Sequence, residues 1–176
     1  TQFRLADWEE QLVLADPGYR TASPHGRLDC FQVDATDTLA LTEYNAETPA
    51  GAGYNDALAE AFATIPVMRA FSRRFSARPL AARTGVGTVI LDAWREFSGQ
   101  WAGPRIAIAD WDDVPTVAEF QLFKAYFATL GLEAVIVDPR TMEYRGGRLY
   151  AGGGPVDLIY NGGIGTYVKA QSQSHA

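Results

Sequence analysis

Strand-like patterning near the N-terminus predicts a β-hairpin. Residues 27–33 and 39–45 each read as a strand in which apolar and polar side chains interchange, and the second ends at a Pro/Gly turn. Strands place successive side chains on opposite faces, so this pattern indicates sheet structure rather than helix. The polar stretch 34–38 between them fits a five-residue hairpin connection.

Helical periodicity flanks this hairpin. Residues 7–14 read as a short helix with Asp7 as its N-cap, and residues 55–62 as a helix capped by Asn55 or a neighbour. Pro66 interrupts that helix or starts the next one. A stripe of apolar residues spaced three and four apart then predicts a core-facing surface, and residues 86–97 form another amphipathic helix. The stripe comprises Met68, Phe71 and Phe75.

The pattern changes after residue 104. A buried strand over 105–110, a helix over 115–130 and a strand over 134–138 make a βαβ unit. Residues 142–150 predict a small hairpin turning on two glycines, and 156–160 a third sheet strand. We therefore expect an α/β fold. It divides into a hairpin and helical region (1–98), a small Rossmann-like subdomain (104–160) and a tail (161–176).

Composition narrows the class of protein. The chain has 176 residues, 47% of them hydrophobic, and a net charge of −6, which argues against a general binder of nucleic acid or anionic membranes. We find no stretch long and apolar enough to span a membrane and no secretory signal. The single cysteine, Cys30, fits a reducing, cytoplasmic compartment, and we expect it to be a buried strand residue.

The hairpin also carries the candidate chemistry. Residues two apart on a strand share a face, so the side chains of Arg27 and Asp29 point the same way, and so do those of Glu43 and Asn45. If Val33 lies opposite residue 39, Asp29 faces Glu43 and Arg27 faces Asn45. Opposed carboxylates repel unless a cation lies between them, and carboxylate and amide oxygens suit Mg²⁺. An arginine beside them can hold a phosphate by two hydrogen bonds.

Simpler interpretations stand beside this one. Asp29 and Glu43 can form ordinary surface ion pairs with Arg27. Asp110 and Asp138 follow parallel strands, where ligands bind, but we favour capping or turn roles. Asn55 and Asp56 can mark a helix N-terminus that presents N–H groups to a substrate carboxylate, and Asp157 can form a structural ion pair with Arg105 or Arg140. Glu47 can extend the acidic corner, and His25 is an incidental histidine beside a turn.

One longer string is more specific. The segment Glu-Tyr-Asn-Ala-Glu-Thr-Pro at residues 43–49 resembles the Glu-Tyr-Asn-Ala-Asp-Thr-Pro segment of the circularly permuted ATP-grasp ligases that are similar to glutathionylspermidine synthase. Arg27 and Asp29 match that family's Arg-x-Asp. Segments around residues 108–120, 138–150 and 155–160 resemble uncharacterised bacterial members, so the likeness covers about residues 3–160.

The resemblance implies an activity and a set of roles. In this family ATP phosphorylates a carboxylate and an amine then captures the acyl phosphate, which forms an amide. Arg27 is implied to be catalytic and to contact phosphate, with Asn45 beside it at the nucleotide. Asp29, Glu43 and Asn45 are implied to ligate Mg²⁺, and residues 104–160 to be a pre-ATP-grasp-like layer.

The resemblance also has departures. The lobes that clasp ATP are expected after residue 160, and the chain begins at Thr1 rather than Met, so we expect an N-terminal fragment that is inactive alone and lacks those C-terminal lobes. The segment 161–170 instead resembles part of large NAD-dependent glutamate dehydrogenases. Three hypotheses follow: a ligase acting on peptide or small-molecule carboxylates and amines, a noncatalytic interaction module, and a dehydrogenase fragment.

Overall fold

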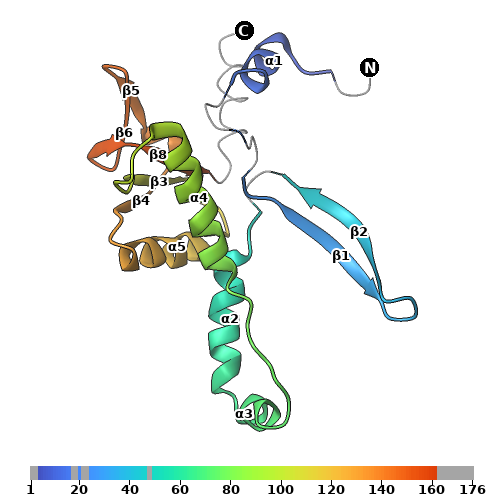
Figure 1. Cartoon of the computed structure of the whole chain (residues 1–176). Helices are drawn as coiled ribbons and strands as arrows, with labels where there is room; N and C mark the ends of the chain where they lie inside the picture. Colours follow the sequence, from blue (N-terminus) through green and yellow to red (C-terminus); the bar gives the residue numbers. More distant parts are fainter. Residues whose placement is uncertain (1–3, 17–19, 21–23, 47–48, 162–176) are drawn as a thin grey trace.

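The computed structural model describes residues 4–16, 20, 24–46 and 49–161. The chain has the predicted α/β fold, with a body built on a parallel sheet. A long hairpin and a pair of helices extend from that body in different directions (Figure 1). Helix α1 (Asp7–Val13) begins one residue earlier than predicted, because Ala6 rather than Asp7 is its N-cap. The backbone N–H of Ala6 donates to Glu9 Oε2 at 2.8 Å.

The predicted βαβ unit forms the centre of the body. Strands β3 (Ile106–Ala109) and β4 (Ala134–Val137) are parallel and are joined through helix α5 (Val117–Thr129). Strand β8 (Leu158–Asn161) pairs with the other edge of β3, so the strand order is β4-β3-β8. The third predicted strand is therefore present but begins two residues later than expected.

Strand β3 is buried on both faces, which explains its continuous apolar sequence. Ile106 and Ile108 pack with helices α4 (Ala82–Ser98) and α5, where Phe123 and Phe127 are fully buried. The alternate residues Ala107 and Ala109 pack with a second cluster under a small antiparallel sheet. Their small side chains let that sheet approach closely, as expected for a covered parallel strand.

The small hairpin predicted over residues 142–150 is present as part of a three-stranded antiparallel sheet. Its strands are β5 (Glu143–Arg145), β6 (Arg148–Ala151) and β7 (Gly154–Val156), and it follows a 3₁₀ turn, η1 (Pro139–Thr141). Gly146 and Gly147 make the predicted turn with φ of 57° and 75°, a region that favours glycine.

Arg105 joins the small sheet to the body. Its guanidinium donates to the carbonyls of Ala151, Gly152 and Pro155 at 2.9–3.1 Å. Asp157 accepts the backbone N–H of Arg105 at 3.0 Å and lies 3.4 Å from an Arg148 nitrogen. The expected structural role of Asp157 holds, but its charged partner is Arg148 rather than the guanidinium of Arg105 or Arg140.

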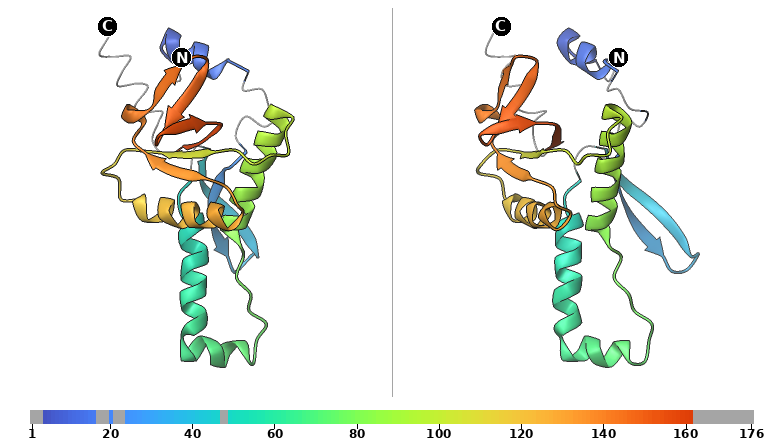
Figure 2. Two further views of the ribbon diagram at one scale, coloured as in Figure 1. Left: turned by 90° about the vertical axis from the view of Figure 1, so that its left-hand side faces the viewer. Right: turned by 60° about the vertical axis from the view of Figure 1, so that its left-hand side comes forward.

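Helices α2 (Ala52–Thr64) and α3 (Pro66–Ser72) extend away from the sheet (Figure 2). Pro66 starts α3 in its first turn, as one of the two sequence alternatives proposed. The expected core-facing stripe is wrong, because Phe71 and Phe75 are 45% and 53% exposed. Periodicity correctly grouped these side chains, but α3 lies at the far end of α2, where no part of the sheet covers it.

The hairpin consists of β1 (Arg27–Val33) and β2 (Thr38–Asn45). Nearly every residue of both strands is exposed, including Cys30, which contradicts the expectation of a buried cysteine. The hairpin projects from the body as a separate ribbon, so neither face meets the core (Figure 1). Within the described residues, no helix is both long and apolar enough to cross a membrane.

Candidate functional site

The register of the hairpin brings the four predicted site residues together. Arg27 lies opposite Asn45 and Asp29 lies opposite Glu43, as the sequence predicted. The two carboxylates therefore face each other across one end of the hairpin, beside the arginine and the amide. This end is the root of the hairpin, where the chain passes from β2 toward helix α2.

A β-bulge makes this register possible. At the far end Val33 pairs with Thr38, not with Leu39, and the connection has four residues rather than five. The register shifts by one residue between Asp29 and Cys30, where Thr42 is the extra residue on β2. The Thr42 hydroxyl donates to the Asp29 carbonyl at 2.9 Å. The assumption that Val33 lies opposite Leu39 was therefore wrong, but the extra residue of the bulge restores the predicted pairing of Asp29 with Glu43 at the root.

The side chains at the root form one connected cluster. Arg27 binds Asp29 at two points, Nε to Oδ1 at 2.7 Å and Nη2 to Oδ2 at 3.1 Å. Asn45 joins this pair to Glu43 when its amide nitrogen donates to Glu43 Oε1 at 3.1 Å and its oxygen accepts from Arg27 Nη2 at 3.3 Å. Two carboxylates, one amide and one guanidinium thus share a small exposed surface.

Electrostatics at the root favour an ionised pair. The hydrogen bonds from Arg27 hold the pKa of the Asp29 carboxyl below its ordinary value, and the same bonds raise the pKa of Arg27. The ordinary ion pair foreseen for Arg27 is therefore present with Asp29. Glu43 forms no ion pair with a described residue, so its negative charge stays available.

A divalent cation fits the donor set of this cluster. Asp29, Glu43 and Asn45 offer carboxylate and amide oxygens, which Mg²⁺ binds while keeping positions for water or phosphate. The alternative orientation of the Asn45 amide turns its oxygen toward Glu43 Oε1, and a cation between the two oxygens would stabilise that orientation. Among the described residues no three His, Cys, Asp or Glu side chains group closely enough for a metal, so this site depends on the amide.

No protein-family model matches the chain, and no curated protein matches it significantly. The residues themselves must therefore carry the functional interpretation.

Arg27 also connects the hairpin to the turn before α2. Its Nη1 donates to the Ala50 carbonyl at 2.5 Å. The next residue, Gly51, is the N-cap of α2 and has φ of 115°, a conformation that favours glycine. The backbone conformation at position 51 thus explains why the predicted turn has a glycine there, and the turn lies against the Arg27 guanidinium.

Glu119 anchors that turn from the other side. This carboxylate is only 3% exposed and accepts the backbone N–H of Gly51 at 2.9 and 3.0 Å and of Gly53 at 2.8 Å. The Tyr54 hydroxyl in turn accepts the Glu119 N–H at 3.2 Å. Sequence reasoning assigned Glu119 no role, because a glutamate in the first turn of α5 resembles an ordinary local capping residue.

Glu119 answers the question about the N-terminus of α2. Its carboxylate takes the N–H groups that were considered for a substrate carboxylate, so those groups are not available. Asn55 and Asp56 do not cap α2 either. Asp56 accepts the N–H groups of Ala82 and Arg83 and so caps α4, while the Asn55 amide donates to the Leu80 carbonyl.

An open cavity of about 630 Å³ lies beside Arg27. The hairpin root, the turn before α2 and the first turns of α4 form its walls. His25 lines it and is about half-buried; this burial lowers the pKa of its imidazole, which the nearby Glu119 carboxylate partly offsets. Small and apolar side chains make up much of the remaining wall: Pro24, Pro49, Ala50, Ala52, Ala82, Val86 and Val89.

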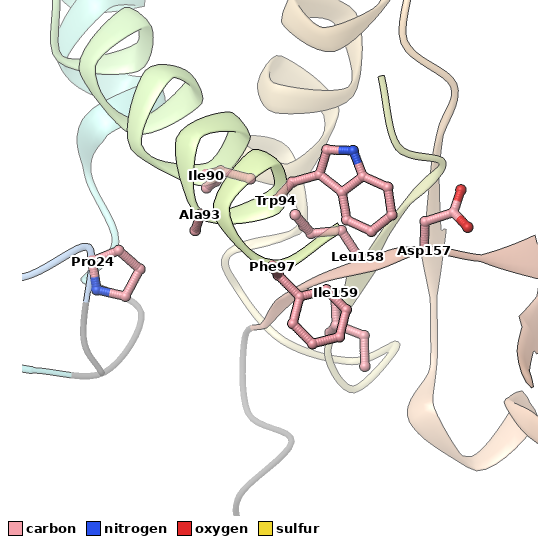
Figure 3. A pocket seen from close by; sticks show the side chains of 8 residues that line it. All are labelled: Pro24, Ile90, Ala93, Trp94, Phe97, Asp157, Leu158 and Ile159. Carbon is pink, nitrogen blue, oxygen red and sulfur yellow. The ribbon is translucent and has the colours of Figure 1, made fainter. Parts of the chain in front are cut away.

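A second hollow of about 260 Å³ lies between α4 and β8 (Figure 3). Trp94 and Phe97 face Leu158 and Ile159 across it. Asp157 is the one ionisable residue among the described residues that line it, and its carboxylate is engaged by Arg105 and Arg148. This hollow therefore offers apolar surface without an available reactive group.

The aspartates that follow the parallel strands have structural roles. Asp110 accepts the N–H of the next residue, Trp111, at 2.8 Å. The expectation that it caps the following helix is wrong, because Thr116 is the N-cap of α5. Asp138 caps the 3₁₀ turn η1 by accepting the Arg140 N–H at 2.8 Å. Its carboxylate also pairs with the Arg140 guanidinium, which lies over the Trp111 ring at 4.9 Å.

Replacing Arg140 by methionine should raise the pKa of Asp138. The hydrogen bonds from Arg140 lower this pKa from 3.8 to about 2. Between about pH 4 and pH 2 the unfolded chain binds a proton at Asp138 that the folded chain does not bind. The pair therefore stabilises the folded state fully above about pH 4, and this stabilisation is lost as the pH falls toward 2. A carbon-detected NMR titration of the Asp138 carboxyl should show a midpoint near 2, and a higher midpoint in Arg140→Met, which loses the guanidinium but keeps the backbone N–H at residue 140. Arg145→Met is the control and should leave it unchanged; an unshifted midpoint in Arg140→Met would contradict the pairing.

Two sequence features fall outside the structural description. Glu47, which was considered an extension of the acidic corner, is not among the described residues. Nor is the segment 162–170, on which the dehydrogenase hypothesis depends. The site considered below therefore consists of the hairpin root alone.

Proposed function

We propose that this chain contributes the metal- and phosphate-binding corner of an ATP-dependent carboxylate–amine ligase in the cytoplasm. The observation that carries the proposal is the register that sets Asp29 opposite Glu43 and Arg27 opposite Asn45. These are the residues for which the likeness to glutathionylspermidine synthase-like enzymes implies a role. Peptide or small-molecule carboxylates and amines are the proposed substrates.

The proposed chemistry has two steps. A substrate carboxylate oxygen attacks the γ-phosphorus of ATP, the bond to the β-phosphate oxygen breaks, and ADP leaves. An amine then attacks the acyl carbon, loses a proton, and inorganic phosphate leaves as the amide forms. Mg²⁺, held by Asp29, Glu43 and Asn45, would neutralise charge that develops on the phosphate oxygens.

Arg27 has a defined part in this scheme. Its guanidinium is shared between Asp29 and the Ala50 carbonyl, and it faces the open cavity of about 630 Å³. A phosphate in that cavity would compete with Asp29 for the guanidinium, and a cation would compensate Asp29 for the lost partner. The arginine can then stabilise the phosphoryl group by charge-assisted hydrogen bonds.

A noncatalytic interaction module is the second candidate. The observation in its favour is the exposed hairpin, on which Leu28, Phe31, Leu39, Leu41 and Tyr44 are all 58–70% exposed. The two candidates separate at the root, because an interaction module has no need for two opposed carboxylates beside an arginine.

Calorimetric titration of the chain with ATP in the presence of Mg²⁺ tests the proposal. Binding should require Mg²⁺, and Asp29→Asn and Glu43→Gln should each weaken it at least ~10-fold, because each removes one charged ligand. Asp34→Asn, a carboxylate lost from the exposed tip of the same hairpin, is the matched control and should bind like the wild type. Equal binding by all four proteins, or binding that does not depend on Mg²⁺, would refute the site.

A further inference from the structure

Helix α3 and the segment after it form a basic apolar arm, defined here as residues 65–80. Four arginines lie in it without any carboxylate: Arg69, Arg73, Arg74 and Arg78. None of them forms an ion pair with another described residue. Val67, Phe75 and Leu80 are 68%, 53% and 76% exposed, so apolar surface accompanies the charge. An arm of this kind needs a partner that is both acidic and apolar.

The outer part of the hairpin has the opposite charge. Residues 28–46 contain no lysine or arginine, and Asp34 and Asp37 lie in the connection at the tip. Neither aspartate forms an ion pair with a described residue. Phe31, Leu39 and Leu41 on the adjoining strands are 66–70% exposed. An isolated two-stranded hairpin is marginal in water, so this one also needs a covering surface.

We propose that the hairpin of one copy docks on the arm of a second copy, and the reverse, in a two-fold symmetric dimer. Acidic tip residues would lie against the arginines while apolar side chains of both surfaces become buried. In an isologous dimer every contact occurs twice, so one kind of contact covers both hairpins and both arms. The dimer makes no use of Asp29, Glu43 or Asn45 and is independent of the proposed ligase function.

The arrangement of one copy favours a partner over self-contact. The hairpin and the arm leave the body in diverging directions in Figure 1 and in the right-hand view of Figure 2, with the arm at the far end of α2. An anionic lipid surface would satisfy the arm but repel the acidic hairpin tip and leave its apolar side chains exposed. A second copy supplies what both surfaces lack.

Charge reversal in both surfaces tests the dimer. Sedimentation velocity of the full chain over a concentration series should show a monomer–dimer equilibrium. Asp34→Lys with Asp37→Lys sets lysines against arginines, and Arg73→Glu with Arg74→Glu sets glutamates against aspartates. Each double variant should self-associate at least ~10-fold more weakly, since like charges are then opposed in both contacts. All four positions are exposed, and circular dichroism spectra that match the wild type show that the fold is kept, including the turn at Asp37, whose φ is 48°.

Mixing the two double variants gives the decisive result. Both contacts of a mixed dimer are complementary, one with lysines against glutamates and the other as in the wild type. An equimolar mixture should therefore form heterodimers under conditions where neither variant dimerises alone. A wild-type chain that stays monomeric, variants that dimerise unchanged, or a mixture without heterodimers would each overturn the proposal. So would a monomeric chain whose arginines bind phosphatidylserine vesicles.

Discussion

Glu119→Ala is expected to lower the free energy of unfolding by about 3 kcal/mol. The carboxylate is buried and accepts the N–H groups of Gly51 and Gly53 at the N-terminus of α2. Its removal leaves the buried N–H of Gly53 and the partly buried N–H of Gly51 without their acceptor, and an unpaired buried donor costs about 1–3 kcal/mol. It also frees the turn whose Ala50 carbonyl holds Arg27. Urea denaturation monitored by circular dichroism measures the loss.

Two variants show whether the loss arises from these hydrogen bonds. Glu119→Gln keeps one acceptor oxygen and should cost less than the alanine change. Glu10→Gln alters an exposed glutamate on α1 and should stay within about 0.5 kcal/mol of the wild type. A Glu119→Ala protein as stable as the Glu10→Gln control would show that Glu119 does not anchor α2 to α5.

Phe123→Ala should be the more damaging change, at about 3–5 kcal/mol. Phe123 is fully buried on α5, with ring centroids 6.0 Å from Phe127 and 5.1 Å from Tyr160. Alanine there leaves a cavity between the helix layer and the sheet. Thermal unfolding followed by calorimetry is the appropriate measurement, because the packing enthalpy falls with the midpoint temperature.

Phe62→Ala is the matched control for this change. Phe62 also lies on a helix, α2, but is 52% exposed, so its truncation removes little buried surface. It should cost no more than about 1 kcal/mol. Similar losses in the two variants would mean that the core is not centred on α5 and β3.

The sequence predicted the local elements well because their signals are local. Gly146 and Gly147 identified their turn through the backbone conformation that glycine favours, and the run 106–109 identified a strand covered on both faces. The pairing of Asp29 with Glu43 was predicted correctly although the assumed loop register was wrong by one residue, because the bulge at Thr42 compensates for that residue. A bulge has little sequence signal, since one extra residue is compatible with many side chains.

What lies against an element could not be predicted in the same way. Periodicity grouped Phe71 with Phe75 but gave no information that the surface they form lies beyond the reach of the sheet. Cys30 appeared suited to a buried strand, yet nothing in the described chain covers the hairpin. Glu119 reaches Gly51 across 68 positions, and only the fold reveals such a distant hydrogen bond.

The direct test of the central claim is to locate a divalent cation on the chain. Mn²⁺ takes the oxygen ligands that Mg²⁺ takes, and its unpaired electrons broaden the NMR signals of nearby amides. With ATP and substoichiometric Mn²⁺, we predict the strongest broadening at residues 27–29 and 43–45, and its loss in the Asp29→Asn, Glu43→Gln double variant. Broadening centred on residues 110–113 and 138, or unchanged in the variant, would contradict a metal site at the hairpin root.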